Sequence, residues 1–72
     1  MDFIEREAAK AVRDKLKMIL PDLKAAYHSA KRLEDDYNWD ARSDQMCEAY
    51  MTIADVYLEV IESLEEEREV EK

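Results

Sequence analysis

The sequence predicts an all-α protein built as a long antiparallel helical hairpin, and three observations lead to that prediction. The chain has 72 residues with no glycine and one proline, whereas strand hairpins usually need glycine-rich turns. Charged residues make up 42% of the chain, as in a well-solvated helical protein. The apolar residues recur in steps of three and four, which indicates helices packed against each other. The length predicts a single helical domain over residues 1–72.

The first predicted helix covers residues 3–37. From residue 9 onward its apolar residues form one heptad row of the coiled-coil type, and a row of lysines on the same helix also repeats every seven residues. The apolar row is Ala9, Val12, Leu16, Ile19, Leu23, Ala26, Ala30, Leu33 and Tyr37, and the lysine row is Lys10, Lys17, Lys24 and Lys31. Both rows keep phase across Pro21, and the flanking residues contain no Gly, Asn or Ser that would reverse the chain. We therefore expect one helix with a kink at Pro21, where the backbone loses a hydrogen bond.

A turn is predicted at residues 38–41. Asn38 can adopt the left-handed conformation that ends a helix, and Asp40 can cap the next helix, with Ser43 as an alternative cap. The second helix is predicted at residues 42–68. Its acidic C-terminal end is expected to fray, because glutamates are unfavourable at the negative end of a helix dipole.

The second helix carries two adjacent heptad rows of apolar residues. The first is Met46, Tyr50, Ile53, Tyr57, Val60 and Leu64, and the second is Cys47, Met51, Ala54, Leu58 and Ile61. Together they span about 200° of the helix, twice the ~100° stripe of an ordinary surface helix. Because one neighbouring helix cannot cover both, we expect the second row to be a dimer or bundle interface in a homodimeric four-helix bundle. The alternative is a monomeric three-helix bundle, in which the first helix bends sharply at Pro21.

The net charge of -8 arises entirely in the second half of the chain. Residues 1–36 hold eight basic and eight acidic side chains, and residues 37–72 hold three basic and eleven acidic ones. This balance disfavours nucleic acid and anionic membrane as partners, and favours a protein with a basic surface. The candidate partner-binding residues form an acidic face on the second helix. They are Glu48, Asp55, Glu59, Glu62 and Glu66.

No catalytic residue, cofactor or metal site is predicted. Cys47 and His28 are the only cysteine and histidine, too few for the four ligands of a structural zinc, and no phosphate-binding loop or nucleophile elbow occurs. Asp2 and Glu5 stand where a signal peptide would carry basic residues, and no apolar run approaches the ~20 residues of a membrane span. We therefore expect a cytoplasmic protein that is not an enzyme.

These features predict a small acidic interaction module that regulates or inhibits a macromolecular partner. Phage-encoded inhibitors include small acidic helical proteins, and the carboxylate rows suggest a sharper version in which the acidic face mimics nucleic acid. Trp39, at the turn, has two interpretations: it folds back to close the end of the bundle, which we favour, or it is an anchor residue for the partner. The alternative function is RNA binding through the lysine row, because a hairpin dimer of this kind resembles in outline the plasmid Rop-type hairpin dimers.

Overall fold

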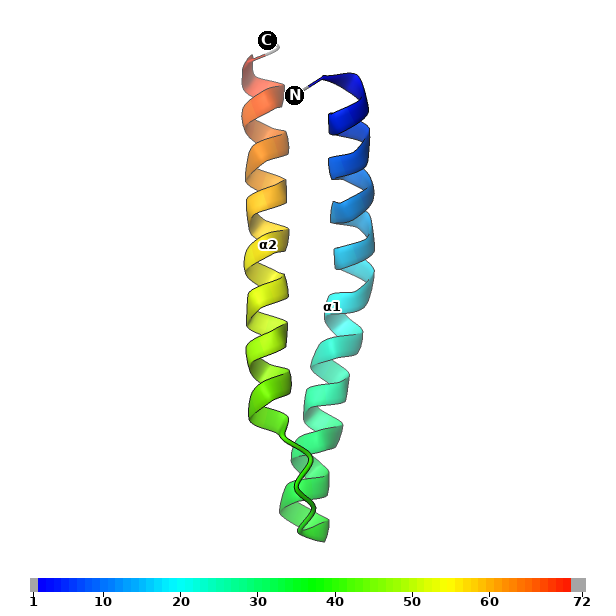
Figure 1. Cartoon of the computed structure of the whole chain (residues 1–72), viewed down its shortest axis with the longest axis vertical. Helices are drawn as coiled ribbons and strands as arrows, with labels where there is room; N and C mark the ends of the chain where they lie inside the picture. The colour runs from blue at the N-terminus through cyan, green and yellow to red at the C-terminus, as the bar shows by residue number, and fades with distance from the viewer. Residues whose placement is uncertain (1, 71–72) are drawn as a thin grey trace.

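The computed structural model describes the backbone of residues 2–70 and the side chains of residues 2–66. Two α-helices, α1 (Phe3–Tyr37) and α2 (Ser43–Val70), lie side by side and run in opposite directions (Figure 1). The molecule measures 55 × 14 × 13 Å, and the described residues contain no strand. The all-α helical hairpin expected from the sequence is thus confirmed. Neither helix, over the described residues, has an apolar stretch that could cross a membrane.

Both ends of α1 are closed by local hydrogen bonds. At the start, the Asp2 side chain accepts a hydrogen bond of 2.8 Å from the Glu5 N–H, as expected of an N-cap residue. At the end, Asn38 has φ 58° and ψ 37°, and its N–H donates to the Leu33 carbonyl. The Trp39 N–H donates to the same carbonyl at 3.2 Å. The left-handed Asn38 therefore ends the helix, and the N–H groups of Asn38 and Trp39 both find an acceptor in the last turn.

Pro21 lies inside α1, which continues on both sides of it as one helix. Proline has no N–H, so one helical hydrogen bond is missing there, and this commonly bends a helix. Figure 1 shows α1 changing direction gently in its cyan middle section, so that its second half leans towards α2. The first helix does not fold back at Pro21, and the described residues form two helices rather than a three-helix bundle.

The contact between the helices uses a heptad seam on each of them. On α1 the buried and half-buried residues include Ala9, Arg13, Leu16, Leu20, Leu23, Tyr27, Ala30 and Glu34. On α2 they include Ser43, Cys47, Tyr50, Ala54, Tyr57, Ile61 and Leu64. The steps alternate between three and four on both helices, as the pattern of a helix pair requires.

Half of the seam predicted for α1 is correct and half is replaced. Ala9, Leu16, Leu23 and Ala30 face α2 as expected, whereas the other residues of the predicted row are exposed, namely Tyr37 at the end of the helix and Val12, Ile19, Ala26 and Leu33. The residues one position later, Arg13, Leu20, Tyr27 and Glu34, take their place. This rotation of α1 buries part of the Leu20 and Tyr27 side chains and brings the Glu34 carboxylate to the start of α2. The hydrogen bonds at the turn and the burial of the larger Leu20 and Tyr27 side chains therefore stabilise the hairpin more than burial of the row with Val12, Ile19 and Leu33 would.

The bend at Pro21 leads to a stability prediction. Pro21 is exposed, and proline within a helix is about 3 kcal/mol less favourable than alanine. We expect Pro21→Ala to raise the free energy of unfolding by about 1 to 3 kcal/mol in urea titrations followed by circular dichroism at one fixed protein concentration. The control Met18→Ala, at an exposed position one turn earlier, should change it by less than about 0.5 kcal/mol. A destabilised Pro21→Ala variant would show instead that the bend is needed for contact with α2.

Candidate functional site

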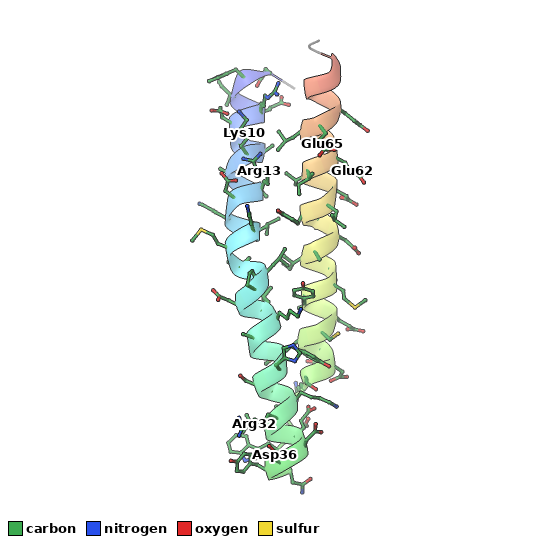
Figure 2. The ribbon with its side chains drawn as sticks, turned by 180° about the vertical axis from the view of Figure 1, so that it is seen from behind. Lys10, Arg13, Arg32, Asp36, Glu62 and Glu65 are labelled. Atoms are coloured by element: carbon green, nitrogen blue, oxygen red, sulfur yellow. The ribbon has the colours of Figure 1, made fainter. Side chains whose placement is uncertain are left out.

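The acidic face of α2 is fully open to solvent. Its carboxylates, Glu48, Asp55, Glu59, Glu62 and Glu66, are all exposed. At 100° per residue they lie on the side of α2 roughly opposite its seam and therefore point away from α1, as Figure 2 shows for Glu62. None of them has an ion pair with another of the residues whose side chains are described. The five residues predicted to bind a partner are therefore exposed on one side of α2.

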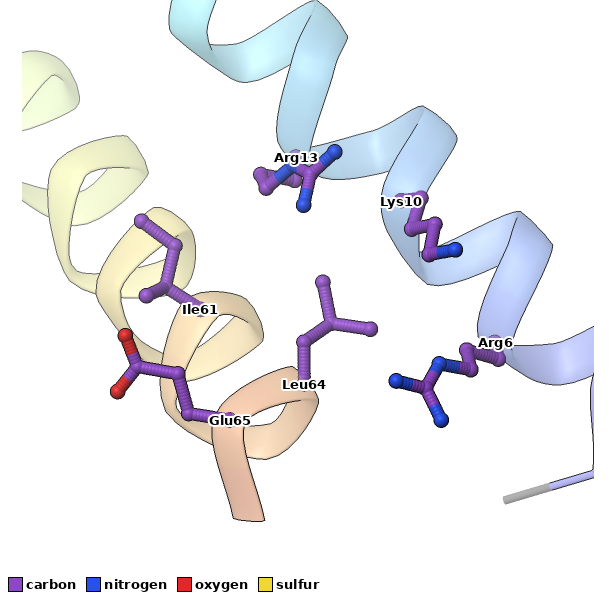
Figure 3. Close-up of a pocket in the computed structure, with 6 residues that line it drawn as sticks. All are labelled: Arg6, Lys10, Arg13, Ile61, Leu64 and Glu65. Carbon is purple, nitrogen blue, oxygen red and sulfur yellow. The ribbon is translucent and has the colours of Figure 1, made fainter. Parts of the chain in front are cut away.

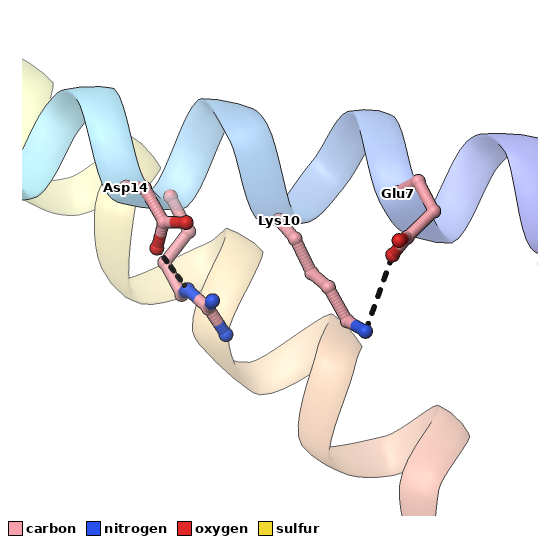
Figure 4. Close-up of polar contacts among 4 residues, drawn as sticks. Glu7, Lys10 and Asp14 are labelled. Atoms are coloured by element: carbon pink, nitrogen blue, oxygen red, sulfur yellow. Dashed lines mark hydrogen bonds and ion pairs between the residues drawn. The ribbon is translucent and has the colours of Figure 1, made fainter.

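The charges of α1 are arranged differently, because cations and carboxylates are interspersed along that helix and four of the cations pair with nearby carboxylates. The pairs and their nitrogen to oxygen distances are Lys10 and Glu7 at 3.2 Å, Arg13 and Asp14 at 2.9 Å, Lys31 and Asp35 at 3.9 Å, and Arg32 and Asp36 at 3.3 Å. The first two pairs are seen in Figure 4, and the last lies near the turn in Figure 2. Exposed pairs of this kind stabilise a helix only weakly. They do, however, balance the charge of α1 and leave α2 as the negative side of the molecule.

A groove of about 550 Å³ lies at the open end of the hairpin (Figure 3). Arg6, Lys10 and Arg13 line it from α1, and Ile61, Leu64 and Glu65 line it from α2. The sequence analysis did not single out this cluster, although positions 6, 10 and 13 are spaced to share one side of a helix. The Lys10 and Arg13 side chains already pair with carboxylates, and Glu65 is part of the lining. The groove is thus an amphipathic surface of mixed charge.

A second, smaller groove of about 230 Å³ lies between the middle of α1 and the first half of α2. Its lining residues are Lys24, Tyr27, His28, Cys47, Tyr50 and Met51. The Cys47 sulfur lies 4.0 Å from the Met51 sulfur, and the Tyr27 and His28 rings have centroids 5.3 Å apart. These are packing contacts of soft and aromatic groups. Among the described residues there is also no group of three or more His, Cys, Asp or Glu placed to hold a metal ion.

The row predicted to form a dimer or bundle interface is divided by the rotation of the helices. Cys47, Ala54 and Ile61 are half-buried within the hairpin, whereas Met51 and Leu58 are 59% and 55% exposed. At the turn, Trp39 is 65% exposed and does not close the end of the hairpin. An exposed tryptophan on a short loop is suited to insertion into a partner.

The turn contains a polar clamp that the sequence analysis missed. The Ser43 N–H donates to Glu34 Oε2 at 3.0 Å, and the Ser43 hydroxyl donates to Glu34 Oε1. These two bonds, with a smaller contribution from the Lys31 charge, hold the pKa of Glu34 below its usual value. The expected caps were Asp40 and, as the alternative, Ser43, but α2 begins at Ser43 and the Ser43 N–H is satisfied by Glu34 of α1. Glu34 lies nine residues before Ser43, so no local capping pattern reveals the pair.

Comparisons with protein-family models, with curated proteins and with solved structures found no significant match to the chain.

The clamp leads to a prediction about the stability of the hairpin. Ser43 is buried, and Ser43→Ala removes its hydroxyl bond to Glu34. We expect the melting temperature to fall by about 4 to 8 °C, the change produced by losing roughly 1 kcal/mol in a domain of this size. Ser63→Ala, an exposed serine in the middle of α2, is the matched control and should change it little. Equal effects of the two substitutions would contradict a role of the clamp in joining the helices.

The same clamp predicts a dependence of stability on pH. Because the folded-state pKa of Glu34 is lowered, unfolding at low pH takes up a proton at this residue, and stability rises with pH. The contribution is complete above the unfolded-state pKa of about 4.3 and is lost as the pH falls through the lowered folded-state value. Glu34→Gln should therefore flatten the stability profile below pH ~4.5, measured by thermal melts. Parallel profiles for wild type and Glu34→Gln would contradict the assignment.

Proposed function

We propose that this protein is a non-enzymatic interaction module that regulates or inhibits a macromolecular partner by binding a basic surface with the acidic face of α2. The observation that carries the proposal is the asymmetry of charge. The carboxylates of the acidic face are exposed without ion pairs to the described residues, while four cations of α1 pair with carboxylates of their own helix, namely Lys10, Arg13, Lys31 and Arg32. A field of one sign on one side of a molecule attracts a partner of opposite charge and orients its approach.

Mimicry of nucleic acid is the form of this function that the geometry supports best. Glu48 and Glu66 are 18 residues apart, which is about 27 Å along a helix. Five carboxylates over that length are about 7 Å apart on average, or about half the linear charge density of one DNA strand with phosphates every 3.4 Å. A homodimer, which we propose as the working form, carries ten such carboxylates. We propose that Trp39, which is exposed at the turn, adds an apolar anchor to this interaction.

Affinity capture with three forms of the protein tests the proposal. The first is wild type, and the second replaces the five acidic-face carboxylates by amides. The third is a matched control in which five exposed carboxylates of α1 are replaced, namely Glu7, Asp14, Asp22, Asp35 and Asp36. Both variants change the net charge from -8 to -3. The α1 control also removes the four ion pairs of that helix, which stabilise it only weakly.

The expected result is a partner that wild type and the α1 control retain and that the acidic-face variant loses. The dissociation constant for that partner should rise at least ~10-fold in the acidic-face variant, and its dependence on salt should weaken, because exposed charges are screened by ions. If the partner is a nucleic-acid-binding protein, wild type should displace labelled duplex DNA or RNA from it. A partner held equally by all three forms would refute binding through the acidic face.

A second candidate function is RNA binding in the manner of a Rop-type hairpin dimer. The observation that favours it is the groove where Arg6, Lys10 and Arg13 gather, continued along α1 by Lys17, Lys24 and Lys31. A mobility-shift assay at low salt with hairpin and single-stranded RNA separates the two functions, because phosphate contacts are strongest there. RNA binding that is lost in Lys17→Gln with Lys24→Gln and retained in the acidic-face variant would favour this function, and no shift with any RNA would exclude it.

A further inference from the structure

The rotation of α1 leaves a row of branched apolar residues in solvent. Val12 and Ile19 are 44% and 42% exposed, Leu33 is 36% exposed, and Met46 on α2 is 38% exposed. Ala26 is also exposed, and Ile53 and Val60 are half-buried. We call these seven residues the apolar face: Val12, Ile19, Ala26 and Leu33 on α1, with Met46, Ile53 and Val60 on α2. Each row repeats every seven residues, so each runs straight along its helix.

The two rows of the apolar face lie on the same side of the hairpin. Each helix has two rows of residues that flank its seam. On α1 these are the lysine row and the Val12 row, which consists of Val12, Ile19, Ala26 and Leu33. On α2 these are the Met51 row, which consists of Met51 and Leu58, and the Met46 row, which consists of Met46, Ile53 and Val60. Lys24 and Met51 line one common groove, so the lysine row and the Met51 row share one side. The Val12 row and the Met46 row must therefore share the other side. Between positions 12 and 60, the Val12 row and the Met46 row contain no charged residue.

The hairpin exposes far more surface than a compact protein of its mass. Its accessible area is 5889 Å², whereas a folded monomer of 8.5 kDa exposes about 4,650 Å². Its radius of gyration is 16.5 Å, against about 11 Å for a compact domain of this length. The excess of roughly 1,200 Å² is of the size that a protein interface removes, which is about 800 Å² per partner.

We propose that a second copy of the chain covers the apolar face, so that two hairpins pack face to face as a four-helix bundle. This inference names the surface of the dimer on which the proposed function rests. A second copy has the same length and the same apolar rows, and it fits a flat face two helices wide along its whole length. Burying these rows leaves no unpaired charge inside the interface. The acidic face lies on the other flank and the outer side of α2, so both copies keep it exposed.

The opposite side of the hairpin is less suited to a second copy. On that side, Met51 and Leu58 lie between two charged rows. The lysine row of α1 is on one side of them, and the carboxylates Glu48, Asp55 and Glu62 of α2 are on the other. A second copy would have to remove these charges from water or leave the face partly open. Met51 and Leu58 are the two exposed residues of the row that the sequence predicted as the dimer or bundle interface. Substitutions at these two positions therefore provide the matched control.

Sedimentation equilibrium at several concentrations tests the proposal, with circular dichroism to monitor folding. Wild type should sediment as a dimer of about 17 kDa, twice the 8.5 kDa of the chain. The double variant Ile19→Gln with Leu33→Gln should raise the dimer dissociation constant at least ~100-fold, because twofold symmetry removes four apolar side chains from one interface. The control Met51→Gln with Leu58→Gln, at more exposed positions of the other face, should change it less than ~3-fold.

A measurement on wild type covers the case in which the double variant fails to fold. In a mixture of ¹³C-labelled and unlabelled chains, isotope-filtered spectra should show contacts between chains from the methyl groups of Val12, Ile19 and Leu33. A folded wild-type monomer at all concentrations would refute both this inference and the proposed dimer. A dimer that is weakened only by the Met51 and Leu58 substitutions, or whose contacts come only from those residues, would refute the apolar face alone. Neither result affects the acidic face, which the capture experiment tests separately.

Discussion

The seam between α1 and α2 is the contact on which the rest of the structure depends, and it is only one layer of side chains deep. In a two-helix hairpin each seam residue has protein on one side and solvent on the other. Most of the seam is therefore half-buried, and Ala30 and Leu64 are the only buried apolar residues among those described. Burial contributes roughly 25 cal/mol per Å² of apolar surface, and ordering the chain costs about 1 to 2 kcal/mol per residue. A seam this thin makes further association the natural way to complete the core.

The polar bonds at the turn decide which residues that seam contains. Glu34 belongs to the same row of α1 as Leu20 and Tyr27, so a carboxylate that reaches Ser43 turns this row towards α2. The row on the other flank, with Val12, Ile19 and Leu33, is turned outward by the same rotation. The clamp and the apolar face are thus two results of one orientation of α1. The left-handed residues Asn38 and Arg42, with φ of 58° and 53°, allow the five connecting residues to make this close return.

The helices and the turn could be predicted because local sequence patterns specify them, whereas the orientation of α1 about its own axis has no such pattern. The helix through Pro21 was predictable because two heptad rows keep phase across it, and the turn was predictable because Asn38 tolerates a left-handed conformation. The exposure of the acidic face follows from the cost of burying carboxylates. The rotation of α1 was not predictable, because Ala9, Leu16, Leu23 and Ala30 belong equally to a seam completed by Val12 and Ile19 and to one completed by Leu20 and Tyr27. The pairing of Glu34 with Ser43 favours the second seam together with the larger Leu20 and Tyr27, and these two polar residues are distant in sequence and have no local motif.

The separation of charge and apolar surface around the hairpin gives its two proposed interactions opposite responses to salt. Two copies that share the apolar face bring together net charges of -8 each, and screening by ions reduces the repulsion between them. Salt should therefore strengthen the dimer. A basic partner on the acidic face is held by attraction between exposed charges, which the same ions weaken. Because the carboxylates lie on the flank and outer side of α2 that a second copy would not cover, each interaction can change with salt without the other being lost, and titration with salt distinguishes them within a single sample.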